Sequence, residues 1–155
     1  MKQTTICLLV RGDEILLAMK KCGHGQGKWN GVGGKMLPGE TITQTAIREA
    51  QEEIGVTPRQ LQPVARLTFQ FLPDHQADNS STVFLCEDWE GNPIESDEMR
   101  PQWFAKDAIP YSQMWEADAK WLPAVLAGQK LTAVVASDQT TKLISYEQTI
   151  IDGLF

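Results

Sequence analysis

Residues 34–56, GKMLPGETITQTAIREAQEEIGV, carry acidic side chains at a spacing that constrains both fold and chemistry. If residues 42–54 form a helix, Glu49, Glu52 and Glu53 occupy positions i, i+3 and i+4 and share one face. Like charges four residues apart destabilise a helix by roughly 0.2–0.5 kcal/mol. Hard divalent cations such as Mg²⁺ favour oxygen ligands of this kind and often bring substrate phosphates with them. The spacing therefore predicts a helix whose acidic face binds a metal ion and a polyphosphate.

The residues that flank this segment indicate a helix with defined ends. Thr41 to Gln44 match an S/T-x-x-Q capping box, and Gly55 suits the residue that ends a helix. A solvated acidic helix face is the alternative for an isolated ExxEE pattern. Here Glu40 and Arg48 also stand at fixed offsets from a glycine, which favours the metal site.

The length, charge and apolar segments of the chain limit the classes of protein to which it can belong. With 155 residues, we expect one domain over residues 1–155. The net charge is −6 and the chain has no block of consecutive lysines or arginines, which argues against a nucleic acid polymer as partner. The apolar residues 6–10 are too few for a signal peptide core, and no segment is long enough to span a membrane. We expect a cytoplasmic protein, monomeric or weakly dimeric, without a membrane partner.

The cysteines agree with that compartment. Cys7, Cys22 and Cys86 are an odd number without a CxxC pair, so we expect neither disulfides nor a zinc site. Cys7 and Cys86 lie in apolar, strand-like runs and are most simply core residues.

The remaining chain alternates between strand-like runs and turns. Residues 11–13 indicate a hairpin turn, residues 73–81 a polar loop, and Pro101 an edge strand. Apolar residues at helical spacing predict a second helix, although Pro123 lies within it. We expect strands at residues 4–10, 14–19, 28–32, 64–72, 82–86, 99–104, 131–136 and 142–146, and helices at 42–54 and 117–126. These elements imply an α/β/α layered domain around a mixed sheet.

The full spacing of residues 34–56, Gly-x5-Glu-x7-Arg-Glu-Ala-x-Glu-Glu-x-Gly-Val, resembles the signature box of the Nudix hydrolases. The resemblance implies a Nudix-type α/β/α sandwich with a central mixed β-sheet. It also implies Mg²⁺, with Mn²⁺ as a possible substitute, and hydrolysis of a nucleoside diphosphate derivative. The sequence departs from the family pattern at Ala50, where a larger aliphatic residue is usual. Alanine is a good helix former, so this departure affects packing rather than chemistry.

Further segments resemble the branch of the family that hydrolyses oxidised purine nucleoside triphosphates such as 8-oxo-dGTP. They include WNG at residues 29–31, GGK at 33–35, ESDEMRP at 95–101 and MW at 114–115, and the resemblance weakens after about residue 128. The implied substrate is a nucleoside triphosphate, and the implied products are a nucleoside monophosphate and pyrophosphate. The residues that the resemblance assigns to the substrate are Thr5, Lys20, Asn30, Phe69, Phe71, Met99, Trp115 and Asp118.

For Asn30 and Trp115, the chemistry of the side chain itself also supports a role in binding the base. The Asn30 side chain offers both a carbonyl and an amide to a purine edge, although an asparagine can equally close a glycine-rich turn. Trp115 offers a face on which a base can stack, although a tryptophan can equally be a core residue. The branch carries two adjacent aspartates where this chain has Ala117 and Asp118. We therefore expect oxidised guanine nucleotides to be better substrates than oxidised adenine nucleotides.

At the phosphate end, the resemblance implies a metal shell and a catalytic base. Glu49 and Glu53 are the expected direct ligands, with Glu52 as ligand or general base. We expect Arg48 to orient Glu52 and Glu40 to support the network. The carbonyl of Gly33 or Gly34 is expected to complete the shell, Glu98 to serve as base or ligand, and Lys20 and Lys35 to meet phosphates or sugar.

Two other functions remain compatible with this sequence. One is a Nudix pyrophosphatase for an ordinary dNTP, ADP-ribose or a dinucleotide. The other is a non-catalytic nucleotide-binding module on the same fold, since a fold alone does not prove activity.

Overall fold

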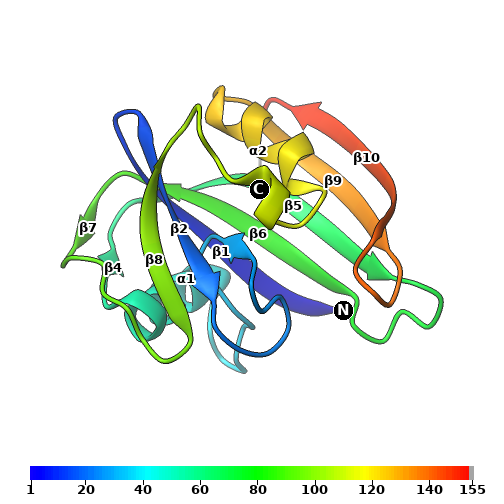
Figure 1. Ribbon diagram of the computed structural model, residues 1–155, viewed down its shortest axis with the longest axis horizontal. Helices are drawn as coiled ribbons and strands as arrows, with labels where there is room; N and C mark the ends of the chain where they lie inside the picture. The colour runs from blue at the N-terminus through cyan, green and yellow to red at the C-terminus, as the bar shows by residue number, and fades with distance from the viewer. Residues whose placement is uncertain (154–155) are drawn as a thin grey trace.

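Strand β1, Lys2–Arg11, forms the centre of the molecule, because six consecutive residues of this strand are buried. In the computed structural model, which describes residues 1–153, β1 lies in an eight-stranded sheet (Figure 1). The strand order is β10-β9-β5-β6-β1-β2-β3, and β8 pairs with β2. The other strands of this sheet are β2 (Glu14–Lys20), β3 (Trp29–Asn30), β5 (Leu61–Phe71), β6 (Asn79–Cys86), β8 (Met99–Ala105), β9 (Lys130–Ser137) and β10 (Leu143–Ile151).

The sheet is mixed, as the sequence predicts. Strand β1 runs parallel to β6, and β5 runs parallel to β9, whereas the other neighbours are antiparallel. Strand β8 pairs with β2 alone among the described strands, which confirms the edge position expected from Pro101.

The two helices, α1 (Ile42–Ile54) and α2 (Asp118–Leu126), pack over two separate hydrophobic clusters. Residues of β1 alternate between these clusters, because successive side chains of a strand point to opposite faces. Cys7 and Leu9 pack in the cluster of α1, whereas Leu8 and Val10 pack in the cluster of α2. The two clusters therefore lie on opposite faces of the sheet, which confirms the α/β/α arrangement.

Helix α1 has the ends that the sequence predicts. The Thr41 hydroxyl accepts a hydrogen bond from the Gln44 amide at 3.1 Å, and the Gln44 side chain accepts one from the Thr41 amide at 2.8 Å. Gly55 ends the helix in the left-handed conformation with φ of 71°. Ala46 and Ala50 are fully buried, and their small side chains let the helix lie close to the sheet.

Several boundaries differ from the sequence-based expectations. Strand β6 begins at Asn79, so the last residues of the expected loop 73–81 pair with β1 and β5. Short strands β4 (Thr57–Pro58) and β7 (Trp89–Glu90) pair with each other, and neither was expected. Backbone pairing with a distant segment decides these cases, and side-chain composition does not reveal it. The expected domain extends to residue 155, and residues 154–155 lie outside the described residues.

Both cysteines that were expected in the core are buried. Cys7 and Cys86 belong to the cluster beneath α1, while Cys22 is exposed, and all three thiols are free. Burial raises the pKa of the Cys7 thiol well above its usual range, which keeps this group neutral.

Candidate active site

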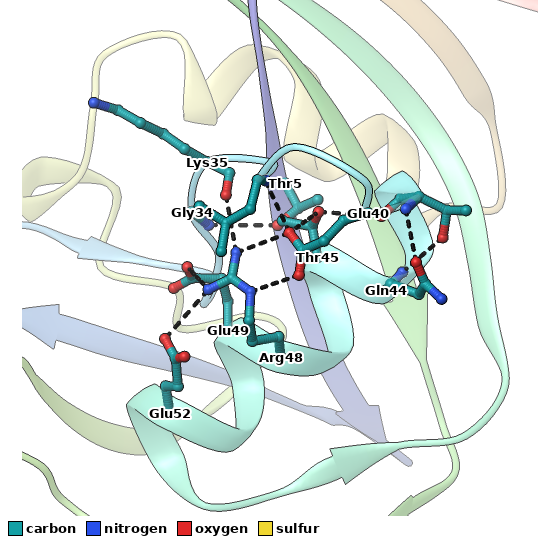
Figure 2. Close-up of polar contacts among 11 residues, drawn as sticks. Thr5, Gly34, Lys35, Glu40, Gln44, Thr45, Arg48, Glu49 and Glu52 are labelled. Carbon is teal, nitrogen blue, oxygen red and sulfur yellow. Dashed lines mark hydrogen bonds and ion pairs between the residues drawn. The ribbon is translucent and has the colours of Figure 1, made fainter.

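Arg48 is the centre of a cluster of carboxylates on α1 and on the loop before it (Figure 2). Its Nε donates to Oε2 of Glu40 at 2.6 Å, and its Nη2 donates to Oε1 of the same residue at 3.1 Å. Nη1 donates to Oε1 of Glu49 at 2.6 Å and to Oε2 of Glu52 at 3.3 Å. Nη2 also donates to the carbonyl of Lys35 at 3.0 Å. Arg48 therefore ties the glycine-rich loop to the helix and fixes the position of the Glu49 carboxylate.

Glu40 supports this arrangement from the start of the helix, as the sequence suggests. Its carboxylate also accepts hydrogen bonds from the Leu37 amide at 2.9 Å and the Thr45 hydroxyl at 3.0 Å. The hydrogen bond from Arg48, followed by that from the Leu37 amide, lowers the pKa of Glu40 to about 2. Glu40 therefore stays ionised and keeps Arg48 in place at any physiological pH.

Glu53 lies beneath this cluster and is only 3% exposed. Its Oε2 atom has no hydrogen-bond partner among residues 1–153. Burial, a hydrogen bond with Glu49 and repulsion from the Glu49 charge raise the pKa of Glu53, against the opposing effect of the Lys20 charge, and the charge of Glu98 raises it further. A buried carboxylate oxygen without a partner, next to a second carboxylate, is the donor set that a hard divalent cation prefers. These residues therefore fit a metal ion.

The other expected metal ligands lie further from this pair. The side chain of Glu52 is 60% exposed and meets Arg48 on the outer side of the helix, so Glu49, Glu52 and Glu53 share one face only in part. Glu98 is exposed and lies in the bend that directly precedes β8. Among residues 1–153, no group of three or more His, Cys, Asp or Glu side chains is already arranged to hold a metal ion.

The two glycines that were expected near the metal make close approaches that a side chain would block. A Cβ on Gly34 would lie 2.5 Å from the carboxyl carbon of Glu49, and one on Gly33 would lie 1.8 Å from the carbonyl oxygen of Thr5. The Gly34 carbonyl already accepts a hydrogen bond from the Thr5 amide at 3.0 Å. Glycine is therefore needed at both positions to bring the loop against β1 and α1.

Beside this cluster lies a cavity of about 230 Å³ between the sheet, the loop before β3 and the start of α2. Glycines 33 and 34 line it as well, so the cavity reaches the loop that contacts Glu49. The eight residues that the resemblance assigns to the substrate all line this one cavity, namely Thr5, Lys20, Asn30, Phe69, Phe71, Met99, Trp115 and Asp118.

Asp118 is the buried acidic residue of this cavity, with 2% of its surface exposed. Its Oδ1 accepts a hydrogen bond from Nε1 of Trp121 at 3.0 Å, and its Oδ2 has no hydrogen-bond partner in the described part of the chain. Burial raises the pKa of Asp118 to about 7, against the opposing effect of the Trp121 hydrogen bond. At neutral pH, a substantial fraction of this carboxyl group is therefore protonated and can donate a hydrogen bond into the cavity.

Asn30 closes a turn and also lines the cavity, whereas Trp115 lines the cavity and is not part of the core. The Oδ1 atom of Asn30 accepts a hydrogen bond from the Gly31 amide at 2.8 Å, which stabilises the turn and leaves the side-chain amide available to the cavity. Trp115 is half-buried, and Nζ of Lys28 lies 5.4 Å from its ring centroid. Trp115 is therefore a wall of the cavity and not a core residue.

The sequence analysis missed other residues of the cavity wall, chiefly His24, Lys28 and Glu116. His24 stands in a glycine-rich loop, where a lone histidine carries no signal by itself. The ring of His24 packs 5.1 Å from that of Trp115, and this contact depends on the tertiary structure. Lys35, which was expected near phosphates, extends its amine away from the carboxylate cluster (Figure 2).

The fold and the carboxylate cluster together define a Nudix-type domain. The family model described as NUDIX domain matches residues 1–125, and the chain therefore belongs to the Nudix family. The chain is similar to an oxidized purine nucleoside triphosphate hydrolase of Danio rerio, with 47% identity over 125 residues, which cover 81% of this chain and 80% of the relative. It is also similar to the protein of the same description in Mus musculus, with 36% identity over 96% of this chain and 95% of that relative.

A solved structure shares the whole architecture. The structure described as the mMutator MutT protein from Bacillus halodurans superposes with a TM-score of 0.85 and 26% identity, covering 96% of this chain and 97% of that chain. The likeness therefore includes β9 and β10, which lie beyond the residues that the family model matches. Within residues 1–153, no helix has the length and apolar composition that a membrane crossing requires.

Proposed function

We propose that this chain hydrolyses oxidised purine nucleoside triphosphates such as 8-oxo-dGTP to the monophosphate and pyrophosphate, and so removes damaged nucleotides from the precursor pool. The observation that carries the proposal is the cavity that holds Asn30, Trp115 and the buried Asp118 beside the carboxylates of α1. Two curated relatives with 47% and 36% identity have the same described activity, which supports the assignment.

The base would occupy the cavity end that Asn30 and Asp118 line. The free amide of Asn30 donates hydrogen bonds, and the carboxyl group of Asp118 donates when it is protonated and accepts when it is ionised. Stacking of a base on an aromatic ring such as Trp115 contributes about 1–3 kcal/mol. Phe69, Phe71 and Met99 would complete an apolar surround, with Thr5 and Lys20 at the edge towards α1.

The triphosphate would extend towards α1. Glu49 and Glu53 would hold Mg²⁺, with Glu52, Glu98 and a carbonyl of Gly33 or Gly34 as further ligands or, for the two glutamates, as the general base. When bound, Mg²⁺ would polarise the phosphate oxygens and neutralise their charge, and Mn²⁺ would serve as a substitute. A water oxygen would bond to one of the two phosphorus atoms that the bridging oxygen between the α- and β-phosphates joins, and the proton of the water would pass to the general base. The bond from that phosphorus to the bridging oxygen would break, which releases the monophosphate and pyrophosphate. Arg48 would keep Glu49 and Glu52 in position through its direct hydrogen bonds.

We further propose that residues 1–155 act as one domain, as a monomer or weak dimer, without a nucleic acid polymer as partner. A cytoplasmic location would suit the exposed free thiol of Cys22, since reducing compartments keep such thiols from pairing.

The test is a steady-state comparison of pyrophosphate release from 8-oxo-dGTP and dGTP with Mg²⁺, alongside AMP release from ADP-ribose. We expect kcat/KM for 8-oxo-dGTP to exceed that for dGTP by about tenfold or more, since buried polar groups discriminate by roughly 1–3 kcal/mol. A higher kcat/KM for ADP-ribose or for dGTP would assign the chain to another Nudix substrate. Tight binding of 8-oxo-dGMP without any turnover would indicate a non-catalytic module.

A further inference from the structure

His24 is one of the cavity residues that have no role in the proposed function. Its ring lies against two of the aromatic walls, with centroids 5.1 Å from Trp115 and 5.8 Å from Phe71. The loop that carries it has glycines on both sides in the left-handed conformation, Gly23 with φ of 77° and Gly25 with φ of 84°. A Cβ on Gly25 would lie 3.4 Å from the Trp115 ring, so the loop packs directly on this tryptophan. The backbone therefore presents His24 to the cavity.

Both ring nitrogens of His24 lack a hydrogen-bond partner among the described residues, and the side chain is exposed at the cavity mouth. Several polar atoms around His24 already form hydrogen bonds within the protein. Asn30 uses Oδ1 for the Gly31 amide, Glu116 uses Oε1 for the Leu143 amide, and Asp118 uses Oδ1 for Trp121. Ala117, which is buried in the same wall, offers no polar side chain. His24 is therefore a donor and acceptor that a nucleotide in this cavity can meet.

The surroundings favour the neutral form of the imidazole. The titratable groups that share the cavity with His24 are Lys20 on β2, Lys28 before β3, and Glu116 and Asp118 beside α2. Partial burial and the positive charge of Lys20 lower the pKa of His24. A neutral imidazole has one N–H donor and one nitrogen acceptor, and can therefore pair with a base that offers one of each.

We propose that His24 is a specificity-determining residue that hydrogen-bonds to the purine of the bound nucleotide while its ring extends the aromatic wall of Trp115 and Phe71. This inference rests on the proposed function of the cavity. An oxidised guanine suits such a partner, because oxidation at carbon 8 places a carbonyl acceptor next to an N–H donor. His24 makes no contact with the carboxylates of α1 among the described residues, so the role concerns binding and not the hydrolytic step.

The first experiment observes His24 directly by NMR. The chain has two histidines, and His75 lies on an exposed loop where it pairs with Asp78 at 2.8 Å. The two imidazole signals can therefore be assigned with the His75→Asn variant, since asparagine tolerates the positive φ of 61° at that position. Titration of the metal-free wild type with 8-oxo-dGMP should shift the His24 signal and leave the His75 signal in place.

The second experiment separates the hydrogen bond from the ring. His24→Phe keeps an aromatic ring, so we expect KM for 8-oxo-dGTP at pH 7.5 to rise about fivefold, which corresponds to one hydrogen bond, with little change in kcat. His24→Ala also removes the ring contacts and should raise KM further, by about tenfold or more. His75→Asn serves as the control and should keep the KM of the wild type.

The outcomes distinguish this inference from the proposed function. If 8-oxo-dGMP changes the tryptophan fluorescence of the wild type while the His24 signal does not move, the cavity binds the nucleotide without His24 and the inference is wrong. An unchanged KM in His24→Phe would lead to the same conclusion. If the wild type neither binds 8-oxo-dGMP nor hydrolyses 8-oxo-dGTP, the proposed function fails and this inference fails with it.

Discussion

Arg48 and Glu40 form a two-point ion pair, with Nε 2.6 Å from Oε2 and Nη2 3.1 Å from Oε1. The remaining nitrogen of the guanidinium, Nη1, reaches Glu49 at 2.6 Å. Arg48 therefore links the loop before α1 to the carboxylate of Glu49, which we propose as a metal ligand. A planar guanidinium can make these contacts simultaneously, whereas the ammonium group of lysine is a point charge.

Replacement of this arginine tests the importance of that geometry. For Arg48→Lys, we expect kcat/KM to fall by about 10–100-fold, the usual effect of losing a residue that positions metal ligands. The affinity for Mn²⁺, measured by electron paramagnetic resonance, should fall as well. Arg11→Lys changes an exposed arginine that pairs with Glu14 at 3.3 Å and should behave as the wild type. Equal activity of the two variants would show that Arg48 does not position the metal ligands.

We expect alanine to cause different defects at the two adjacent glycines, a loss of activity at Gly34 and a loss of stability at Gly33. In Gly34→Ala, the new methyl group meets the end of the flexible Glu49 side chain, which can move, so we expect activity to fall while stability changes by no more than about 1 kcal/mol. In Gly33→Ala, the methyl group meets the backbone of β1 at Thr5, which cannot move without disturbing the sheet.

Urea denaturation should therefore show a large loss of stability for Gly33→Ala, on the order of 3 kcal/mol. Gly153→Ala serves as a control, since a Cβ there has no neighbour within 4 Å among residues 1–153. If Gly34→Ala retained full activity, the close contact between this loop and Glu49 would have no catalytic importance.

Glu53→Gln should lower activity without harming the fold. The substitution replaces a buried carboxyl group, whose pKa burial and the neighbouring Glu49 raise, with a neutral amide of the same size, so the free energy of unfolding should be unchanged or higher. We expect kcat to fall by about 10²–10³-fold, because the variant loses a charged metal ligand. Glu52→Gln changes an exposed side chain and should leave stability as it is. Near-normal turnover of Glu53→Gln would contradict the proposed site.

Asp118 makes stability depend on pH in a defined direction. Below about pH 4, this carboxyl group is protonated in both the folded and the unfolded chain. As pH rises from about 4 to about 7, the unfolded chain loses the proton while the folded chain keeps it, because burial raises the pKa of Asp118 to about 7. Stability therefore falls through this window and levels off above it.

Asp118→Asn removes this titration. Between pH 4.5 and pH 7.5, we expect the loss of unfolding free energy to be smaller in the variant than in the wild type, by on the order of 3 kcal/mol. Urea denaturation at both pH values measures this difference. Parallel pH profiles for the two proteins would show that the carboxyl group of Asp118 titrates normally.

Ala117 predicts a preference among oxidised bases. This residue is 3% exposed and lines the cavity beside Asp118, where its methyl group offers no hydrogen bond. A missing buried hydrogen bond costs roughly 1–3 kcal/mol, so we expect kcat/KM for 2-hydroxy-dATP to be about tenfold or more below that for 8-oxo-dGTP. Ala117→Asp should narrow the difference. Comparable values for the two substrates in the wild type would show that Ala117 does not limit the choice of base.

The sequence by itself determined helix α1 and its chemistry. The capping residues Thr41 and Gln44 and the terminal Gly55 act within a few positions of the helix ends, so local reading located both boundaries. The spacing of Glu40, Arg48, Glu49 and Glu53 identified the carboxylate cluster, because helical periodicity converts sequence offsets directly into neighbours.

The tertiary structure decided how the cavity is assembled and which atoms remain free within it. Thr5, Asn30, Phe69 and Asp118 come from distant parts of the chain and meet because β1 pairs with β6, and β5 pairs with both β6 and β9. Three further features appear only in three dimensions. They are the exposed position of Glu52, the contact of His24 with Trp115, and the oxygens of Glu53 and Asp118 that have no hydrogen-bond partner among the described residues. The physical reason is the distance along the sequence over which each interaction acts. Caps and helical spacings act over a few residues, whereas burial and charge environment depend on residues that the fold brings together from far apart in the sequence.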